Sequence, residues 1–433
     1  MGAWEISLLG FGIMLLLIAF GLPIAFAMLV AGGLGIMHIV GLKAALGMLG
    51  QLPVSVTMNY ELSVVPMFVL MGTFVNRANL SKDLYDAANA FLGHLKGGLA
   101  MATVTACGGF AAVCGSSLAT AATMSQVSMP SMRRYGFKDT LATGSIASGG
   151  TIGILIPPSV ILVLYGIMTG TDIGKLFLAG ILPGILSIGL YIATIFVTTT
   201  IDPDSGPRTE KIGARERVQR LKKVLAVLLL FIIIIGGILG GVFTPTEAGG
   251  AGAFGAFVFA LWRRALTFRI FIDCLVETAR ITSMLFIVLV GAIIFSNFVN
   301  LAGLPQALTT LITSRNVGPM GVMLNILLVY LVLGCFLDSL AMILLTVPIF
   351  FPVVSHLGMD PIWFGIVIVV ISELALITPP VGMNLFVLKS TIPDVDLTTI
   401  YKGIIPFALA DIIRIAILIL FPPISLLLPK LAG

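Results

Sequence analysis

Long uncharged stretches of apolar residues alternate with short polar segments along almost the whole chain. A transmembrane helix needs roughly 20 consecutive apolar residues, and many of these stretches reach or approach that length. We interpret the uncharged stretches as membrane segments, and they are residues 6–42, 62–76, 97–132, 140–171, 176–201, 224–246, 248–262, 281–314, 316–337, 339–359, 361–388 (with Glu373 as its one charge) and 415–429. The pattern predicts an all-α polytopic membrane protein.

One concentrated polar block divides this pattern near its middle. Residues 202–223, DPDSGPRTEKIGARERVQRLKK, hold seven basic and four acidic residues. We interpret the block as a solvated cytoplasmic linker between two halves, residues 1–201 and 224–433. Two further stretches, 77–96 and 265–280, mix charged and apolar residues at helical spacing, and we expect them to lie along the cytoplasmic surface.

The two halves repeat each other when they are aligned with Ser117 opposite Ser339. In this alignment the following positions coincide: Ser117-Leu118-Ala119 with Ser339-Leu340-Ala341, Pro130 with Pro352, Gly136 with Gly358, Pro157-Pro158 with Pro379-Pro380, and Asp172 with Asp394. A Pro-Pro pair in register with other prolines is poorly explained by chance, so we expect an internal duplication. Each half then contains one hairpin and one broken helix, at 97–132 and 140–171 in the first half and at 319–354 and 361–388 in the second.

The basic residues indicate how the first half lies in the membrane, because cytoplasmic loops carry an excess of Lys and Arg. Lys96 precedes the run 97–132, and a basic cluster at 133–138 follows it. Both ends of this run are therefore expected on the cytoplasmic side. A segment that returns to its own side is a re-entrant hairpin.

In the second half the basic ends are exchanged. No Lys or Arg follows the second hairpin directly, whereas Lys389 and Lys402 follow the second Pro-Pro segment. The repeats are therefore predicted to be inverted. We expect ten full spans, two hairpins with tips near 114–118 and 336–340, and both termini on the periplasmic side.

Composition excludes several classes of protein. Of the 433 residues, 58% are hydrophobic and 10% are charged, whereas soluble domains have about 25% charged residues. This composition excludes a soluble protein. The formal net charge of +5 arises in short loops without a basic cluster interleaved with aromatics, so we expect no nucleic-acid partner. The chain lacks a CxxC motif, and we interpret its cysteines as core residues. The histidines lie near predicted segment ends, so we do not expect an intramembrane serine protease or any other enzyme.

Each half carries a Pro-Pro pair inside an apolar stretch. Proline has no N–H, so Pro157-Pro158 deprives the carbonyls of Gly153 and Ile154 of their helical partners, and the second pair does the same for Ala375 and Leu376. Irregular backbone at membrane depth is tolerated only where it is buried in protein or lines a cavity. The freed carbonyls are therefore candidate ligands for a cation.

The hairpin tips add hydroxyl groups opposite the breaks. Ser116 and Ser117 lie at the first tip and Ser339 at the second, and Thr378 adds a hydroxyl at the second break. Oxygen ligands without a carboxylate suit Na⁺ better than a divalent ion. The alternative for either break alone is a proline kink packed against small residues.

Half-helices created by the breaks also expose N-terminal N–H groups, which suit an anionic substrate. The candidate substrate residues are Ser117, Ser339 and Asn384. No Lys or Arg falls within the breaks, so neutralisation of an anion would rest on helix dipoles and bound cations.

Three acids, Glu247, Asp338 and Glu373, interrupt apolar stretches. A carboxylate within a membrane costs roughly 2.5 to 3.5 kcal/mol on insertion scales, so each needs a partner or a cavity. We favour helix capping or positions near the membrane interface, with a proton relay as the alternative. Asp338 stands where Ser116 stands in the first half and is the strongest functional candidate of the three.

Five segments, namely CGSSLATAAT, SGGTIGILIPPS, GVFTPTEAGG, GCFLDSLAMILLTVPIFFPV and LALITPPVGMNLFV, resemble in this order the large membrane subunit of TRAP (tripartite ATP-independent periplasmic) transporters. The resemblance covers nearly the whole chain. It implies an elevator-type, Na⁺-driven importer of organic acids in the bacterial inner membrane, which works with a periplasmic substrate-binding protein and a separate small four-helix membrane subunit. It also implies the sodium ligands Ser116, Ser117, Gly153, Ile156 and Pro158 in the first half and Gly334, Ala375 and Thr378 in the second.

One departure from the family pattern concerns position 375, where the family often has Gly and this chain has Ala. A backbone carbonyl ligand survives this change. Two other functions stay open at this stage. One is a proton- or sodium-coupled anion symporter without a binding protein, in which Asp338 and Glu373 would relay protons, and the other is a passive channel.

Overall fold

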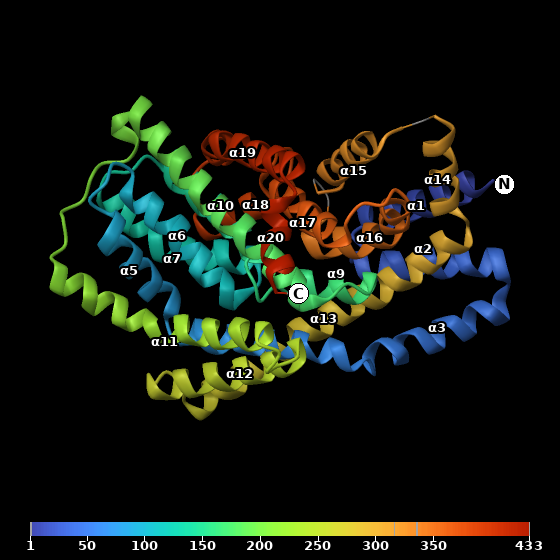
Figure 1. Cartoon of the computed structure of the whole chain (residues 1–433), viewed down its shortest axis with the longest axis horizontal. Helices are drawn as coiled ribbons and strands as arrows, with labels where there is room; N and C mark the ends of the chain where they lie inside the picture. Colours follow the sequence, from blue (N-terminus) through green and yellow to red (C-terminus); the bar gives the residue numbers. More distant parts are fainter. Residues whose placement is uncertain (1, 316, 335–336, 433) are drawn as a thin grey trace.

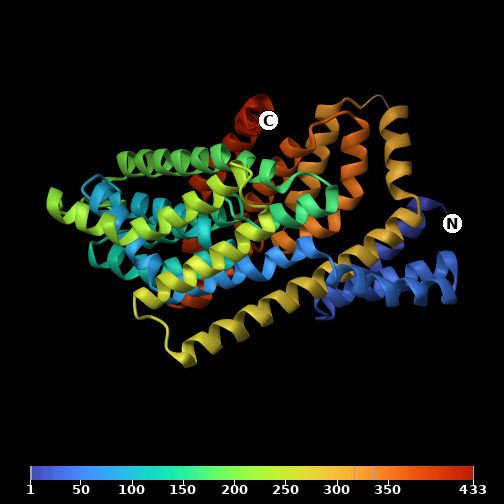
Figure 2. The same ribbon diagram turned by 60° about the horizontal axis from the view of Figure 1, so that its bottom comes forward.

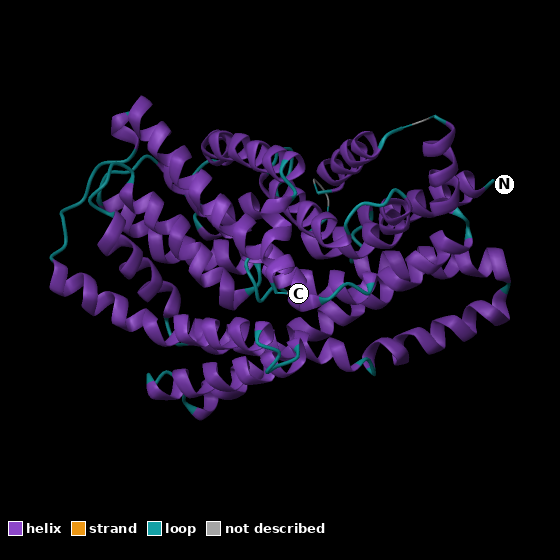
Figure 3. Cartoon of the chain, in the orientation of Figure 1, coloured by secondary structure: helices purple, strands orange, loops and turns teal. Residues whose placement is uncertain are grey.

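The computed structural model describes residues 2–315, 317–334 and 337–432, and all regular structure within these ranges is helical (Figure 3). The helices of the first part of the chain are α1 (Ala3–Ala19), α2 (Ile24–Val40), α3 (Leu42–Thr57), η1 (Tyr60–Ser63), α4 (Val64–Arg77), α5 (Leu80–Leu92), α6 (Gly98–Cys114), α7 (Ser117–Arg134), α8 (Asp139–Thr151), η2 (Ile152–Ile154), α9 (Val160–Thr169) and α10 (Ile173–Ile201).

The short helix η3 (Pro203–Ser205) follows α10. The helices of the second part are α11 (Ala214–Leu239), α12 (Pro245–Trp262), α13 (Phe268–Leu301), α14 (Leu304–Ser314), α15 (Pro319–Leu333), α16 (Ser339–His356), α17 (Pro361–Ile377), α18 (Met383–Thr391), α19 (Leu397–Leu420) and α20 (Pro423–Leu431).

Helix lengths fit a polytopic membrane protein. Five described helices, α10, α11, α13, α16 and α19, have at least 18 residues and are apolar enough to cross a bilayer, and the bent pair of α3 with α4 adds a sixth. Several shorter helices are equally apolar. A helix of 17 residues is about 26 Å long, close to the roughly 30 Å hydrocarbon core. The number of full spans stays a prediction.

Segments far apart in the sequence lie side by side. Helix α13 packs along α2, α12 along α4, and α19 along α8. In Figure 1, α3, α11, α12 and α13 run along the lower edge, and α10, α17, α18 and α19 gather above them. Figure 2 shows α13 extending along the outside of the molecule. Helix α7 also packs against α18, and α16 against α9, so helices of the two halves are in contact.

Two pairs of helices form hairpins, and two helices are broken. Helices α6 and α7 meet at a turn where Gly115 has a φ of +61°, a conformation that favours glycine. Helices α15 and α16 form the second pair, and residues 335–336 of the predicted tip 336–340 lie outside the described residues. The breaks separate α8 from α9 at Pro157-Pro158 and α17 from α18 at Pro379-Pro380, and both Pro-Pro bonds are cis.

Helix starts in the two halves correspond in the alignment that sets Ser117 opposite Ser339. Helices α7 and α16 begin at these two serines, and both have 18 residues. Helices α8 and α17 begin at Asp139 and Pro361, which coincide in the same alignment. The halves differ in one place. Helices α3 and α4 are bent by 54°, whereas α13 runs over 34 residues in their place.

Two sequence expectations differ from the structure. From Phe268 on, the stretch 265–280 is not a separate surface segment but the first turns of α13, because Thr267 caps this helix and no breaker precedes the apolar part. The predicted loop 202–223 is helical from Ala214 on, since its good helix formers start α11. A 2.6 Å ion pair between Glu216 and Arg220 supports this first part of α11.

Candidate cation and substrate site

The first Pro-Pro break lies against the tip of the first hairpin. A methyl group added to Gly153 would lie 3.3 Å from the carbonyl oxygen of Ser116 and 3.2 Å from Oγ1 of Thr120. The hydroxyl of Ser116 caps α7 by accepting a hydrogen bond from the N–H of Ala119 at 3.4 Å. Two of the residues predicted to bind one ion, Ser116 and Gly153, are therefore neighbours.

Pro158 and Ile156, two further predicted ligands of the first ion site, face different neighbours. The carbonyl oxygen of Pro158 lies 3.5 Å from where a methyl group on Gly115 would stand, so it faces the turn of the hairpin. The side chain of Ile156 points to Gly184 of α10, where an added methyl group would be 2.6 Å away. Ile156 could thus contribute only its backbone to an ion site.

One carbonyl predicted to be free at the first break has a partner. The carbonyl of Ile154 accepts a hydrogen bond from the hydroxyl of Ser159 at 2.5 Å. The same hydroxyl oxygen caps α9 by accepting from the N–H of Leu162 at 3.3 Å. The Ile154 carbonyl therefore has a hydroxyl partner in place of the helical N–H that proline lacks. The signal for Ser159 was its position directly after the Pro-Pro pair, where a helix cap belongs.

The second break lies against the end of α15. A methyl group added to Gly334 would lie only 2.2 Å from Cβ of Ala375. The carbonyl of Ala375 accepts a long hydrogen bond of 3.4 Å from the N–H of Thr378. The hydroxyl of Thr378 donates its proton to the carbonyl of Leu374 at 2.6 Å, which leaves its oxygen as an acceptor. The three predicted ligands of the second set are therefore close together.

The predicted substrate residues occupy related places at the hairpins and breaks. Ser117 and Ser339 are the first residues of α7 and α16, and both are buried. Asn384 is buried on α18 and donates to the carbonyl of Ala147 on α8 at 3.4 Å. Its Oδ1 has no hydrogen-bond partner among the described residues. Asn384 thus connects the broken helices of the two halves.

Two of the three acids cap helices. Asp338 caps α16 by accepting from the N–H of Ala341 at 3.1 Å, in the place that Ser116 has on α7. Glu247 forms a capping box with Thr244 at the start of α12. The expectation of a capping role is confirmed for both.

Glu373 behaves differently from these two acids. It is fully buried inside α17 and forms a 2.7 Å ion pair with Arg414 of α19. The expected capping or interface position is therefore wrong for Glu373. The signal that sequence reasoning missed is the pair Asp411 and Arg414, which are spaced i, i+3 on the apolar helix α19 and form a 2.9 Å ion pair.

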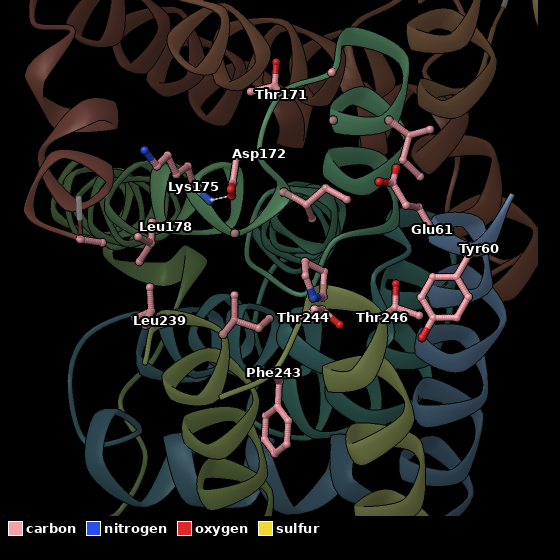
Figure 4. A pocket seen from close by; sticks show the side chains of 18 residues that line it. Tyr60, Glu61, Thr171, Asp172, Lys175, Leu178, Leu239, Phe243, Thr244 and Thr246 are labelled. Carbon is pink, nitrogen blue, oxygen red and sulfur yellow. Dashed lines mark hydrogen bonds between the residues drawn. The ribbon is translucent and has the colours of Figure 1, made fainter. Parts of the chain in front are cut away.

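Two cavities lie away from the breaks. One of about 740 Å³ is bordered by η1, the turn between α9 and α10, and residues 243–246, and Figure 4 shows Glu61 and Asp172 among its lining. The other, of about 550 Å³, lies between α3, α9, α13 and α16. Within the described part of the chain, neither lining includes a predicted ion or substrate ligand.

The fold is similar to that of two solved transporters. The YdaH transporter of Alcanivorax borkumensis superposes with a TM-score of 0.61 at 14% identity, covering 91% of this chain and 89% of that one. MtrF of Neisseria gonorrhoeae gives a TM-score of 0.59 at 13% identity, with 94% of each chain covered. At these identities the likeness concerns the fold alone.

Sequence relatives are more informative. The C4-dicarboxylate TRAP transporter large permease protein DctM of Pseudomonas aeruginosa is 37% identical over 376 residues, 87% of each chain. The sialic acid TRAP transporter large permease protein SiaM of Vibrio cholerae is 36% identical over 375 residues, 86% of this chain and 87% of that one. The ectoine TRAP transporter large permease protein TeaC of Halomonas elongata is 34% identical, with the same coverage.

The family described as "Tripartite ATP-independent periplasmic transporter, DctM component" matches residues 11–424. This range includes both hairpins and both Pro-Pro breaks. The resemblance seen in the sequence is therefore confirmed, and the chain belongs to the DctM family of TRAP transporter large permeases.

Proposed function

We propose that this chain is the membrane subunit of a Na⁺-coupled importer of an organic acid. The observation that carries the proposal is the contact of each Pro-Pro break with a hairpin, through Gly153 on Ser116 and Gly334 on Ala375. Both sets offer carbonyl and hydroxyl oxygens, the ligands of a hard monovalent cation. The proposed sodium ligands are Ser116, Ser117, Gly153, Ile156 and Pro158 at the first break and Gly334, Ala375 and Thr378 at the second.

The substrate is proposed to bind between the two ion sites. Ser117, Ser339 and Asn384 contribute hydrogen-bonding groups there, and bound Na⁺ supplies the positive charge that an anion needs. Relatives are named for C4-dicarboxylates, sialic acid and ectoine, so a small carboxylate is the substrate class to test first. A periplasmic substrate-binding protein delivers it, and a small four-helix membrane subunit completes the transporter in the inner membrane, with both termini of this chain on the periplasmic side.

An elevator motion is the proposed mechanism. The halves 1–201 and 224–433 are proposed to be inverted repeats, and the helix starts that coincide in the alignment of the two halves support the duplication. The unit that moves contains the hairpins and broken helices, and it slides against the helices α4, α11, α12 and α13. Crosslinks that block this movement are expected to stop transport, and transport that persists in the crosslinked protein would contradict the mechanism.

The coupling ion can be tested without the substrate. Thermal unfolding of the purified chain in detergent is followed across titrations of NaCl, KCl and choline chloride at constant ionic strength. A ligand that binds only the folded state adds about 2.7 kcal/mol of stability at 100 times its Kd. We expect a saturable rise in melting temperature with Na⁺ only. Equal effects of the three salts would contradict Na⁺ coupling.

Uptake provides the second test. Proteoliposomes that contain the chain with its small subunit are supplied with the binding protein and a labelled C4-dicarboxylate, sialic acid or ectoine. We expect accumulation of one of these compounds against its gradient only when Na⁺ is high outside. Accumulation driven by a pH gradient alone, without Na⁺ or the binding protein, would instead support the proton-coupled symporter.

A further inference from the structure

Five buried polar side chains meet where α10, α17 and α19 cross, and we name them the Arg414 cluster. Its members are Ser187, Tyr191, Glu373, Asp411 and Arg414, and all of them are fully buried. Nη2 of Arg414 lies 2.7 Å from Oε2 of Glu373 and 2.9 Å from Oδ1 of Asp411. Nη1 of Arg414 donates to the hydroxyl of Ser187. The guanidinium therefore joins all three helices.

The Tyr191 hydroxyl binds Asp411, the second acid of the Arg414 cluster. It donates to both carboxylate oxygens of Asp411, at 2.7 and 2.8 Å. The guanidinium carbon of Arg414 also lies 6.0 Å from the centre of the Tyr191 ring, a cation–π distance. Asp411 thus has two partners, whereas the described contacts of Glu373 in this cluster run through Arg414 alone.

Glu373 has a special position along α17. The helix is otherwise almost wholly apolar, and the hydroxyl of Ser372 bonds within α17, to the carbonyl of Ile368. Near the start of α17, Nε1 of Trp363 donates to the carbonyl of Leu418 on α19 at 2.8 Å. Glu373 supplies the corresponding polar tether near the end of α17, two residues before Ala375.

Fold stability alone does not explain such a cluster. Burying ionised groups costs desolvation energy, and apolar replacements of buried ion pairs are often neutral or stabilising. What directional bonds add is a defined rotation and depth of one helix against another, which Ile and Val side chains specify only loosely. The end of α17 has such a requirement, because its backbone at Ala375 and Thr378 must meet Gly334 of α15.

We propose that Arg414 is a positioning residue for the second cation site. By holding Glu373 against α10 and α19, it fixes the end of α17 where the proposed ligands Ala375 and Thr378 lie. Through its hydrogen bond to Ser187 of α10, Arg414 thereby connects a helix of the first half to the cation site of the second. This inference rests on the proposed Na⁺ coupling and assigns no ligand role to Arg414 or Glu373.

The test compares Na⁺ half-saturation, read from thermal shifts of the full chain in detergent, with melting temperature in choline chloride. Glu373→Met removes the tether and leaves the balanced pair of Asp411 and Arg414. We expect its half-saturating Na⁺ concentration to rise at least tenfold. Glu373→Gln removes the same charge but keeps a side-chain oxygen that can accept from Arg414, so we expect a rise of about threefold. Arg414→Lys keeps the charge and changes the tether, and we again expect a rise of threefold or more.

Tyr191→Phe is the matched control, because it disturbs the Arg414 cluster without touching the bond to Glu373. We expect its half-saturating Na⁺ concentration to stay within twofold of the parent even where its melting temperature in choline chloride falls. A purely structural role would lower melting temperatures in all variants and leave Na⁺ half-saturation unchanged.

Three outcomes would overturn the inference. Equal effects of Glu373→Met and Glu373→Gln would assign the role to charge instead of position. Unchanged half-saturation in Glu373→Met, or in Arg414→Lys should the former fail to fold, would exclude a positioning role while Na⁺ coupling stands. A parent protein without any Na⁺-specific shift would overturn both the coupling and the positioning role.

Discussion

The contact between Gly334 and Ala375 makes the second cation site sensitive to a single methyl group. Gly334 has helical backbone angles, φ −67° and ψ −12°, so alanine meets no backbone strain there. In Gly334→Ala, however, the new Cβ would stand 2.2 Å from Cβ of Ala375. Carbon atoms pack at about 3.5 to 4.0 Å, so the ends of α15 and α17 must separate by about 1.4 Å.

Separating the ends of α15 and α17 in Gly334→Ala costs free energy and weakens Na⁺ binding. Overpacking a close contact typically costs about 1 to 3 kcal/mol. A bound ion needs its ligands at a fixed distance, so much of this cost falls on the Na⁺-bound form. A loss of about 1.4 kcal/mol corresponds to a tenfold weaker affinity. We therefore expect the half-saturating Na⁺ concentration of Gly334→Ala to rise about tenfold or more.

A reciprocal change supplies the control. Ala375→Gly removes the atom that clashes and leaves Cα of Ala375 3.3 Å from the added methyl group. We expect Gly334→Ala combined with Ala375→Gly to recover Na⁺ half-saturation to within about threefold of the parent. Thermal shifts with NaCl against choline chloride measure all four members of this double-mutant cycle.

Two results for Gly334→Ala would contradict this prediction. If Gly334→Ala is folded and titrates with Na⁺ as the parent does, the end of α15 does not border a cation site. If Gly334→Ala changes the Na⁺ titration but the added Ala375→Gly does not restore it, the contact between Gly334 and Ala375 is not the cause of the change.

Three further predictions use the same thermal assay. Thr378→Val keeps the shape of the side chain but removes its oxygen, so we expect weaker Na⁺ stabilisation, and an unchanged Na⁺ titration would refute the ligand role. Ser159→Ala removes the cap of α9 and the partner of the Ile154 carbonyl, so we expect a loss of about 1 to 2 kcal/mol in choline chloride; an unchanged melting temperature would show that the cap is dispensable. The hydrogen bond from Arg133 lowers the pKa of the Asp394 carboxyl, so their ion pair stabilises the fold above the unfolded pKa of about 3.9 and is lost as pH falls through the lower folded value. Melting temperatures of the parent and Asp394→Asn should therefore differ at pH 7 and converge once the pH falls below the lowered pKa of Asp394, and a constant difference would contradict this.

Much of the helical architecture could be predicted because membrane helices appear in a sequence as uncharged apolar stretches that end at polar residues or prolines. Proline lacks an N–H wherever it stands, so Pro157-Pro158 and Pro379-Pro380 marked the places where the helices end. Gly153, Ala375 and Ser116 followed from the Pro-Pro breaks and the hairpin tip, whereas Gly334 came from the family resemblance. The structure supplied the distances of Gly153 to Ser116 and of Gly334 to Ala375.

What escaped prediction depends on contacts between distant segments. Glu373 was taken for an isolated acid because its partner Arg414 lies far along the sequence, on another helix, and no periodicity links the two. The partner of the Ile154 carbonyl was missed for a different reason. A serine hydroxyl can replace the missing N–H, and a count of backbone donors alone does not include it.

The unbroken course of α13 has a consequence for the lipid around the protein. A helix of 34 residues is about 51 Å long, and its uncharged part, 281–301, spans about 31 Å, close to the thickness of an average bilayer. The remaining turns carry charged residues, among them Arg269 and Arg280, and lengthen α13 beyond this uncharged part. Because such a helix cannot shorten, a thinner membrane makes it tilt together with α2, which packs along it, and a thicker membrane must thin around it. We therefore expect the acyl-chain length of the lipids in reconstituted vesicles to change the transport rate.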